Sequence, residues 1–179
     1  IGGVHRGAEV TMDISADLTE MATTNVAIVA AGVKSILDIG LTLEYMETIG
    51  VPVVTYGQDE FPSFYSSKSG FKSPLRLDSA KDIAQLLCAK RELGLNGSVL
   101  IANPVPAEYE MEPAVIEKHI LKALNEANKQ GIKGKAVTPF LLKFIADNTE
   151  GESLEANIAL IKNNAKIAAM IALALHGMK

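Results

Sequence analysis

The sequence contains no tryptophan, a single cysteine and no run of five or more lysine and arginine residues. Because Cys88 is alone, it cannot form an intrachain disulfide, and the chain fits a reducing, cytoplasmic compartment. The 17 Lys and Arg residues against 21 Asp and Glu residues give a net charge of −4, which argues against a protein that coats nucleic acid or an anionic membrane. Small anionic ligands remain compatible with this charge, since they need only a local positive site.

The sequence also lacks an uninterrupted apolar run long enough to cross a membrane. The most apolar stretch, residues 158–175, has sufficient length, but two lysines and two asparagines between positions 162 and 166 interrupt it, and each is costly in hydrocarbon. We therefore expect a buried helix of a soluble protein there. The opening Ile1-Gly2-Gly3 has neither an initiator methionine nor the regions of a signal peptide, which indicates missing upstream sequence.

What the chain does contain is a repeated alternation of apolar strands and amphipathic helices in 179 residues, 48% of them hydrophobic. A mean hydropathy of +0.19 excludes a disordered chain, and this length suffices to bury a core. We predict strands at residues 25–31, 52–56 and 99–102, and helices at 35–47, 79–93, 113–130, 138–146 and from 153 onward. This order predicts an α/β fold, a three-layer α/β/α arrangement with a largely parallel sheet covered by helices on both faces, in a single domain over residues 1–179.

Local signals mark the helix starts and one long loop. Ser35 with Asp38, and Ser79 with Asp82, have the spacing of a capping box, in which side chains satisfy the first backbone amides of a helix. Residues 57–74 form a loop that is rich in Ser, Gly, Pro and Phe. A loop of this length in a compact domain is often functional.

The common catalytic motifs are missing. Residues 2–7 have the glycine spacing of a phosphate-binding loop, but Ala8 stands where the lysine is required, and there is no G-x-G-x-x-G, C-x-x-C, H-E-x-x-H or G-x-S-x-G. The histidines His5, His119 and His176 lie far apart in the sequence. For the last two, a solvent-facing or core position is the simpler interpretation.

Lys34 is the first candidate for chemistry. It follows an apolar strand and Gly32, and it directly precedes the predicted N-cap of a helix. Its ammonium is therefore expected at the carboxyl end of a parallel strand, beside the positive pole of a helix dipole. Desolvation and this pole would both lower the pKa of Lys34, as a nucleophile that forms a Schiff base with a carbonyl requires. The alternative is a lysine whose stem packs on the sheet edge while its ammonium reaches water.

Asp13 and Asp17 form a second constellation together with Ser15, ahead of a short helix. These two carboxylates and a hydroxyl suit a hard divalent cation that keeps several waters, or they serve as helix caps. Residues 2–7 add flexible backbone amides, an imidazole and a guanidinium. That combination suits an anion such as a phosphate ester, or it forms a surface turn.

Two amides lie on one face of the last helix. Asn157 and Asn164 are seven residues apart in an otherwise apolar segment. Buried amides require hydrogen-bond partners, which are either neighbouring backbone groups or a ligand.

Several segments with long and unusual sequences follow one another over nearly the whole chain: Gly2-Gly3-Val4-His5-Arg6-Gly7-Ala8-Glu9, Asp13-Ile14-Ser15-Ala16-Asp17-Leu18, Ala31-Gly32-Val33-Lys34-Ser35-Ile36-Leu37-Asp38, Thr138-Pro139-Phe140-Leu141-Leu142, and Asn157-Ile158-Ala159-Leu160 with Asn163-Asn164-Ala165. Together they resemble the pseudouridine-5′-phosphate glycosidase family, also called indigoidine synthase A-like. The order and length of these segments make the resemblance specific.

This resemblance implies an enzyme that reversibly cleaves the carbon–carbon glycosidic bond of pseudouridine 5′-phosphate to uracil and ribose 5-phosphate, with a divalent metal, usually Mn²⁺. By motif, Lys34 matches the lysine that forms an imine with C1′ of the ring-opened ribose, and Asp13 matches the metal-binding aspartate. A C-glycoside has no leaving-group heteroatom to protonate, so the ordinary scheme of two carboxylates is inadequate, whereas an iminium acts as an electron sink.

The resemblance also implies substrate contacts. Ser15, Ala16 and Asp17 match a substrate-contacting segment, and His5 and Asn157 match positions near the sugar phosphate. The family's general-acid glutamate and phosphate-binding lysine precede the Gly-Gly-Val-His-Arg-Gly motif, and neither is located in this sequence. The chain is therefore expected to be the C-terminal part of a larger or cleaved enzyme.

The family tends to form trimers and acts beside a pseudouridine kinase, sometimes fused to it. The resemblance thus implies a homotrimer and a functionally linked kinase, with small molecules rather than a nucleic acid polymer or a membrane as partners. Two other functions stay open. One is a Schiff-base aldolase that acts on a sugar phosphate, and the other is a non-catalytic ligand-binding fragment.

Overall fold

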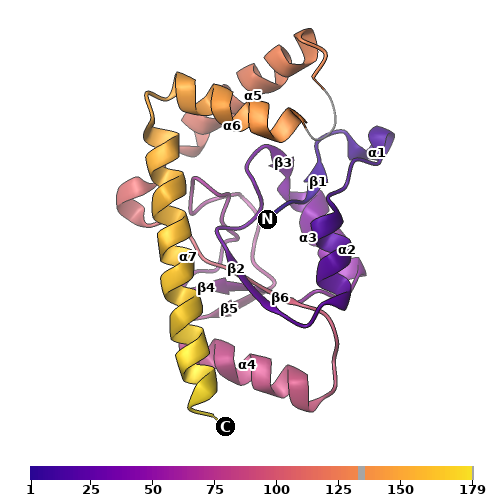
Figure 1. The fold of residues 1–179 in the computed structure, drawn as a ribbon, viewed down its shortest axis with the longest axis vertical. Coiled ribbons are helices and arrows are strands. Elements are labelled where there is room, and N and C mark those ends of the chain that lie inside the picture. The colour runs from indigo at the N-terminus through magenta and orange to yellow at the C-terminus, as the bar shows by residue number, and fades with distance from the viewer. Residues whose placement is uncertain (133–135, 179) are drawn as a thin grey trace.

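A four-stranded parallel sheet forms the centre of the fold in a computed structural model that describes residues 1–132 and 136–178 (Figure 1). Its strands lie in the order β2 (Ala27–Ala30), β6 (Val99–Ala102), β4 (Val53–Tyr56) and β5 (Leu75–Leu77), and each neighbouring pair is parallel. Ile101 pairs with Val29 on one side and with Val54 on the other. The carboxyl ends of the strands therefore share one edge of the sheet.

Two short strands and a set of helices complete the described chain. The strands β1 (Val4–His5) and β3 (Leu37–Asp38) pair with each other in antiparallel orientation, apart from the main sheet. The helices are α1 (Ala8–Thr11), α2 (Ala16–Thr23), α3 (Ile39–Thr48), α4 (Ala80–Glu92), the 3₁₀ helix η1 (Ala107–Tyr109), α5 (Pro113–Lys129), α6 (Val137–Asn148) and α7 (Glu152–His176).

Helices cover both faces of the sheet. On one face, Val54 and Ile101 pack in a core with side chains of α4 and α7. Because successive strand residues point to opposite faces, Val53 and Leu100 belong instead to the larger core, which they share with α2, α3, α5 and α6. The predicted three-layer α/β/α fold with a largely parallel sheet is confirmed.

The predicted caps have different outcomes. At α4, the Ser79 Oγ accepts a hydrogen bond from the backbone N–H of Asp82 at 3.1 Å, as the capping box predicts. The cap predicted at Ser35 is wrong, because α3 begins four residues later and its N-cap is Asp38, whose Oδ1 accepts from the N–H of Leu41 at 2.8 Å. Residues 37–38 pair with β1, so the chain cannot turn into a helix before that pairing ends.

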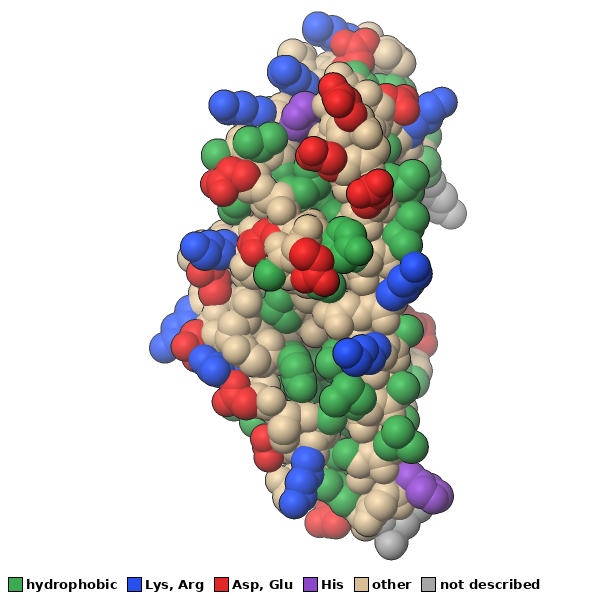
Figure 2. All heavy atoms as spheres, turned by 90° about the vertical axis from the view of Figure 1, so that its left-hand side faces the viewer, with side chains coloured by type: hydrophobic (Ala, Val, Ile, Leu, Met, Phe, Trp, Pro, Cys, Tyr) green, Lys and Arg blue, Asp and Glu red, His purple; other side chains and the backbone are tan. Residues whose placement is uncertain are grey.

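The last helix is less buried than the sequence predicts. By length and composition α7 is apolar enough to cross a membrane, but only 22% of its most apolar window is buried in the structure. It packs along α4 and β2 as part of the fold. Figure 2 faces the α7 side of the molecule and shows hydrophobic side chains spread among charged ones. The expectation of a buried helix is therefore correct for one side of α7 only, and its exposed side includes Leu154, Ile158, Ile161 and Leu173.

Candidate active site

Lys34 lies just beyond the carboxyl end of β2, as the sequence predicts. Its backbone N–H donates to the Ile1 carbonyl at 3.2 Å, and its own carbonyl accepts from the N–H of Leu37 at 2.9 Å. The side chain is half-buried, and its Nζ has no hydrogen-bond or ion-pair partner within the described residues. One part of the expectation is wrong: α3 begins at Ile39, so Lys34 does not stand beside the N-cap of that helix.

The backbone before Lys34 is fixed by the loop at residues 57–74. Gly32 has a φ of +84°, and a Cβ built on it would lie 2.3 Å from the carbonyl oxygen of Pro62. The N–H of Phe64 donates to the carbonyl of Ala31 at 3.0 Å. Only glycine fits this close approach with a left-handed backbone. The long loop therefore helps to place the segment that carries Lys34.

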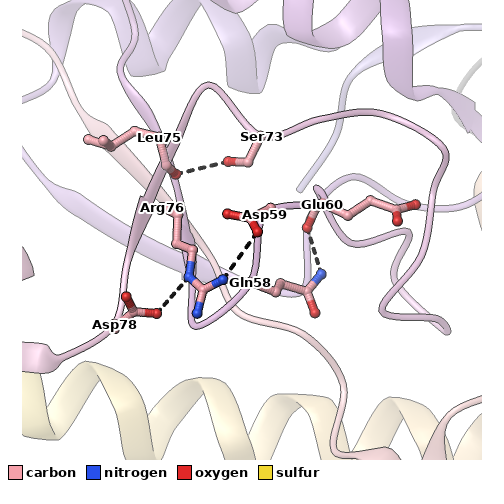
Figure 3. Close-up of polar contacts among 7 residues, drawn as sticks. All are labelled: Gln58, Asp59, Glu60, Ser73, Leu75, Arg76 and Asp78. Atoms are coloured by element: carbon pink, nitrogen blue, oxygen red, sulfur yellow. Dashed lines mark hydrogen bonds and ion pairs between the residues drawn. The ribbon is translucent and has the colours of Figure 1, made fainter.

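Polar contacts hold this loop in place (Figure 3). The Gln58 Nε2 donates to the carbonyls of Glu60 at 2.6 Å and Ser67 at 2.7 Å. Arg76 of β5 donates from Nε to Asp78 at 2.7 Å and from Nη1 to Asp59 at 3.2 Å. In Figure 3 the Glu60 carboxylate points away from Arg76, and its Oε1 accepts from two backbone amides farther along the loop, those of residues 69 and 70.

Ser15, Ala16 and Asp17 form the start of α2. The Ser15 Oγ accepts from the N–H of Asp17 at 3.3 Å, and the Asp17 Oδ2 accepts from the N–H of Gly2 at 2.8 Å. A Cβ on Gly2 would lie 2.2 Å from the Ser15 Oγ, so this contact needs a glycine. The capping interpretation of Ser15 is thus confirmed. Ala16 and Asp17 also line a hollow of about 500 Å³ together with Ile1, Glu20, Met21, Thr24, Val26, Ile28 and Ser98.

The first residues bring Lys34 and the start of α2 together. Ile1 contacts Lys34 through its carbonyl, and the next residue, Gly2, contacts Asp17. Lys34 and the start of α2 are therefore tied to adjacent residues of one backbone segment.

His5 and Asp13 face each other across the turn that contains α1. The backbone N–H of His5 donates to the backbone carbonyl of Asp13 at 3.0 Å, and the ring Nδ1 of His5 lies 3.8 Å from the Asp13 Oδ2. The Asp13 side chain is 49% exposed. Among the residues that the structure describes there is no cluster of three His, Cys, Asp or Glu side chains around a common point. The arrangement suits a hydrated cation that takes one carboxylate from the protein, rather than an all-protein metal cage.

Arg6 does not offer a free guanidinium to an anion. Its Nη1 and Nη2 donate to the two carboxylate oxygens of Glu117 in α5 at 2.7 and 3.1 Å, and Nη2 also donates to the Ser35 carbonyl at 3.1 Å. The hydrogen bond and charge of Glu117 raise the pKa of Arg6 against the effect of burial. Of the two interpretations of residues 2–7, the structural turn therefore fits Arg6 better than an anion site does.

The two amides of α7 have different environments. The Asn164 Oδ1 accepts from the Nδ2 of Asn103 at 2.9 Å, which supplies the partner that the sequence left open. Asn157 is half-buried, and its amide has no hydrogen-bond partner within residues 1–132 and 136–178. The described contacts do not join Asn157 to the segment of Lys34.

Two residues at the carboxyl edge of the sheet escaped the sequence analysis. Asn103 directly follows β6 and is 3% exposed. Thr55, near the end of β4, is fully buried, and in the described part of the chain its Oγ1 finds no hydrogen-bond partner. A polar residue at the end of an apolar strand is the signal that would have identified both, because ligands of parallel sheets bind at this edge.

Comparison with known sequences gives one consistent family. The model of the family described as "Indigoidine synthase A like protein" matches residues 1–174. A pseudouridine-5′-phosphate glycosidase of Geobacillus kaustophilus is 64% identical over 172 residues, which are 96% of this chain and 57% of that protein. The one of Clostridium botulinum is 58% identical over 175 residues, 98% of this chain and 57% of that protein. The chain thus spans little more than half the length of these curated relatives.

Two solved structures share the fold. A prealnumycin C-glycosynthase in complex with ribulose 5-phosphate superposes with a TM-score of 0.92 and 35% identity, covering 99% of this chain and 59% of that one. An indigoidine synthase A-like protein from Thermotoga maritima superposes with a TM-score of 0.87 and 38% identity, covering 99% of this chain and 57% of that one. The fold is therefore common to all three proteins.

Proposed function

Because the chain belongs to the indigoidine synthase A-like family, we propose that it supplies the imine-forming lysine for reversible cleavage of pseudouridine 5′-phosphate to uracil and ribose 5-phosphate. The names of the relatives support this substrate, and the ribulose 5-phosphate in the C-glycosynthase supports a five-carbon sugar phosphate. The observation that carries the proposal is the position of Lys34, half-buried at the carboxyl edge of the sheet with no partner for Nζ in the described residues.

Lys34 would act in its neutral form. Its nitrogen attacks C1′ of the sugar, the bond from C1′ to the ring oxygen breaks, and that oxygen takes a proton. The nitrogen lone pair then expels C5 of uracil, which takes a proton, and C1′ becomes an iminium. Water adds to the iminium, the C1′–N bond breaks, and ribose 5-phosphate leaves with the regenerated amine. The nitrogen lone pair thus supplies the push that breaks the C1′–C5 bond, and the electron pair of that bond leaves with C5 of uracil, where a proton takes it up.

The start of α2 is the proposed substrate-contacting segment. Ala16 and Asp17 line the hollow beside Ile1, Ser15 directly precedes them, and the Ile1 carbonyl accepts from the N–H of Lys34. We propose His5 and Asn157 as contacts near the sugar phosphate. The unpartnered amide of Asn157 among the described residues supports a role in binding, because a half-buried amide gains from a ligand's hydrogen bonds.

Asp13 is the proposed ligand of a divalent cation, Mn²⁺ by the family resemblance. The fit rests on its half-exposed carboxylate and on the 3.8 Å between that group and the His5 Nδ1, which leaves both atoms open to a further partner. Hard cations of this kind take one or two protein carboxylates and fill the remaining positions with water and phosphate oxygens. When bound, such a cation would supply positive charge beside an anionic substrate.

The proposal extends to the setting of the enzyme. From the family resemblance we infer a cytoplasmic homotrimer that works with a pseudouridine kinase. The kinase phosphorylates the nucleoside, and its product is the nucleotide that this reaction would cleave or form. Light scattering of the purified protein tests the trimer directly, since a monomer or dimer contradicts it.

Borohydride trapping with ribose 5-phosphate tests the role of Lys34. In the protein as its organism produces it, we expect an adduct that maps to Lys34 by peptide mass analysis. Lys34→Arg keeps the positive charge but not the nucleophile, since a guanidinium does not lose its proton in proteins. We expect this variant to release uracil from pseudouridine 5′-phosphate at least about 10³-fold more slowly. Lys72→Arg, at an exposed loop lysine, is the matched control.

Each other outcome overturns a part of the proposal. No adduct on the wild-type protein, or an adduct elsewhere, removes Lys34 from the reaction. Turnover of an acyclic aldol donor without uracil release identifies a Schiff-base aldolase instead. Binding of ribose 5-phosphate without either reaction identifies a non-catalytic binding protein.

A further inference from the structure

Besides the loop at residues 57–74 and the Ile1 carbonyl, one side chain holds the backbone around Lys34, that of Arg6, which directly follows β1. The guanidinium of Arg6 makes two bonds to the carboxylate of Glu117, at 2.7 and 3.1 Å. The same Nη2 that binds Glu117 also donates to the carbonyl of Ser35 at 3.1 Å. Three segments far apart in the sequence therefore meet at one planar group: the end of β1, the carbonyl of Ser35 and the amino-terminal part of α5.

The planar fork makes this contact directional. When two parallel N–H groups bind a carboxylate, the orientation of the guanidinium plane is fixed, and the remaining N–H groups point in set directions. Glu117 thus aims one N–H of Arg6 at the Ser35 carbonyl. A lysine ammonium would carry the same charge but could not hold both partners in one plane.

The partners of Lys34 and Ser35 come from the same short stretch. The Lys34 N–H binds the Ile1 carbonyl, the Ser35 carbonyl binds Arg6, and the intervening residues Gly2 and Val4 are themselves tied to Asp17 and Thr42. The backbone of Lys34 and Ser35 is therefore hydrogen-bonded at both ends, at the Lys34 N–H by Ile1 and at the Ser35 carbonyl by Arg6.

We propose that Arg6 and Glu117 are positioning residues for Lys34, and that they keep its amine in line with the sugar C1′ rather than bind the substrate themselves. This inference rests on the proposed imine chemistry of Lys34. Reaction rates depend steeply on such alignment, because a displacement of about 1 Å can cost roughly 100-fold. The stability of the fold depends on it much less, since ion pairs with side chains 33% and 44% exposed contribute little.

The contrast between rate and stability gives the test. In the protein as its organism produces it, we expect Arg6→Lys and Glu117→Ala each to lower two quantities by roughly 10-fold. These are the rate at which borohydride traps the imine at Lys34 and the kcat for uracil release. KM should stay within about twofold, and the thermal midpoint within about 3 °C. The double variant should be no slower than Arg6→Lys alone, because the two residues act as one unit.

The matched control is Glu126→Ala, farther along α5 than Glu117. The Glu126 carboxylate also pairs with a basic side chain, that of Lys129 at 3.8 Å, but within the described chain neither residue is hydrogen-bonded to the Lys34 segment. We expect wild-type trapping and kcat from this variant. An equal loss of rate in Glu126→Ala overturns the inference, because the effect would then be a general one of lost ion pairs.

Other outcomes are equally decisive. Wild-type trapping in Arg6→Lys shows that the fork does not position Lys34, and a raised KM with unchanged kcat shows that Arg6 binds the anionic substrate instead. Both outcomes leave Lys34 as the nucleophile, because the wild-type adduct still forms. If the wild-type protein forms no adduct at Lys34, the proposed function itself fails.

Discussion

At the amino end of the parallel strands, the Lys90 ammonium donates to three backbone carbonyls, those of residues 95–97, at 2.6 to 2.8 Å. At the carboxyl end, the Lys34 ammonium has no such partner among the residues that the structure describes. Two lysines next to the same sheet are thus used differently. Lys90 closes the loop before β6, whereas Lys34 keeps its nitrogen available.

Buried hydroxyls repeat this difference. Ser98, just before β6, donates from Oγ to the Thr24 carbonyl at 2.7 Å. Thr55 lies near the carboxyl end of the neighbouring strand β4 and is equally buried, but its Oγ1 has no partner within the described chain. An unsatisfied buried polar group costs free energy unless a ligand or water satisfies it. Lys90 and Ser98 at the amino end therefore hold the fold, whereas Lys34 and Thr55 at the carboxyl end have no such partner in the described chain.

The largest expected effects come from Gly32 and Gly97, one at each end. Both have a φ of +84°, and an added Cβ would lie 2.3 Å from the Pro62 oxygen at Gly32 and 2.7 Å from the Ala22 oxygen at Gly97. We expect Gly32→Ala and Gly97→Ala each to lower the free energy of unfolding by roughly 3 kcal/mol, measured by urea denaturation. At a temperature where both variants are folded, only Gly32→Ala should slow imine trapping at Lys34. Equal slowing in Gly97→Ala would show that the two ends are not separable.

Substitutions of Thr55 and Ser98 are expected to change the free energy of unfolding by less, and in opposite directions. Thr55→Val replaces an unpartnered hydroxyl by a methyl group of similar shape, so we expect the free energy of unfolding to rise by about 1 kcal/mol. Ser98→Ala leaves the Thr24 carbonyl without its donor, so we expect a loss of about 1 kcal/mol. Urea denaturation of both variants without ligand measures the difference. A loss of stability in Thr55→Val would contradict the assignment of an unsatisfied hydroxyl.

The sequence predicts best what depends on neighbouring residues. β6 has the predicted bounds, residues 99–102, because all four side chains are apolar and buried. β5 was missed because two of its three residues are exposed, so a short edge strand looks like the end of the preceding loop. The cap at Ser35 was mispredicted because β3 pairs with β1, a contact over more than thirty residues that no local pattern contains.

The candidate site shows the same limit. The motifs predict Lys34, Asp13 and the segment at residues 15–17 as site residues. For Lys34, its place after an apolar strand, at the carboxyl edge of the sheet, is a second signal. The contact of Arg6 with Glu117 joins residues 111 positions apart, and it arises only once the fold brings these two side chains together. The partner of Asn164 is likewise a residue 61 positions away, Asn103. Sequence patterns thus identify the candidate reactive groups, while the contacts around them depend on tertiary packing.

The smallest expected effect concerns Glu110, which anchors the carboxyl-end loop through a charge. Its Oε1 accepts from the Ser66 Oγ at 2.8 Å and from the N–H and Oγ of Ser67 at 2.8 and 2.7 Å. Burial alone would raise the pKa of Glu110, but these hydrogen bonds lower it below its ordinary value of 4.5. A carboxyl whose pKa is lower in the folded state stabilises the fold above its unfolded pKa and loses this contribution as the pH falls through the folded value.

Glu110→Gln keeps an acceptor oxygen for Ser66 and Ser67 but has no titrating group. We therefore expect the wild-type protein to lose more stability than this variant as the pH falls from about 6 to about 3, by well under about 1 kcal/mol because the group is exposed. Urea denaturation across this range measures it, with Glu108→Gln, an exposed carboxylate outside the loop, as the control. The same slope with pH in both proteins would show that the charge of Glu110 does not help to hold the loop beside Lys34.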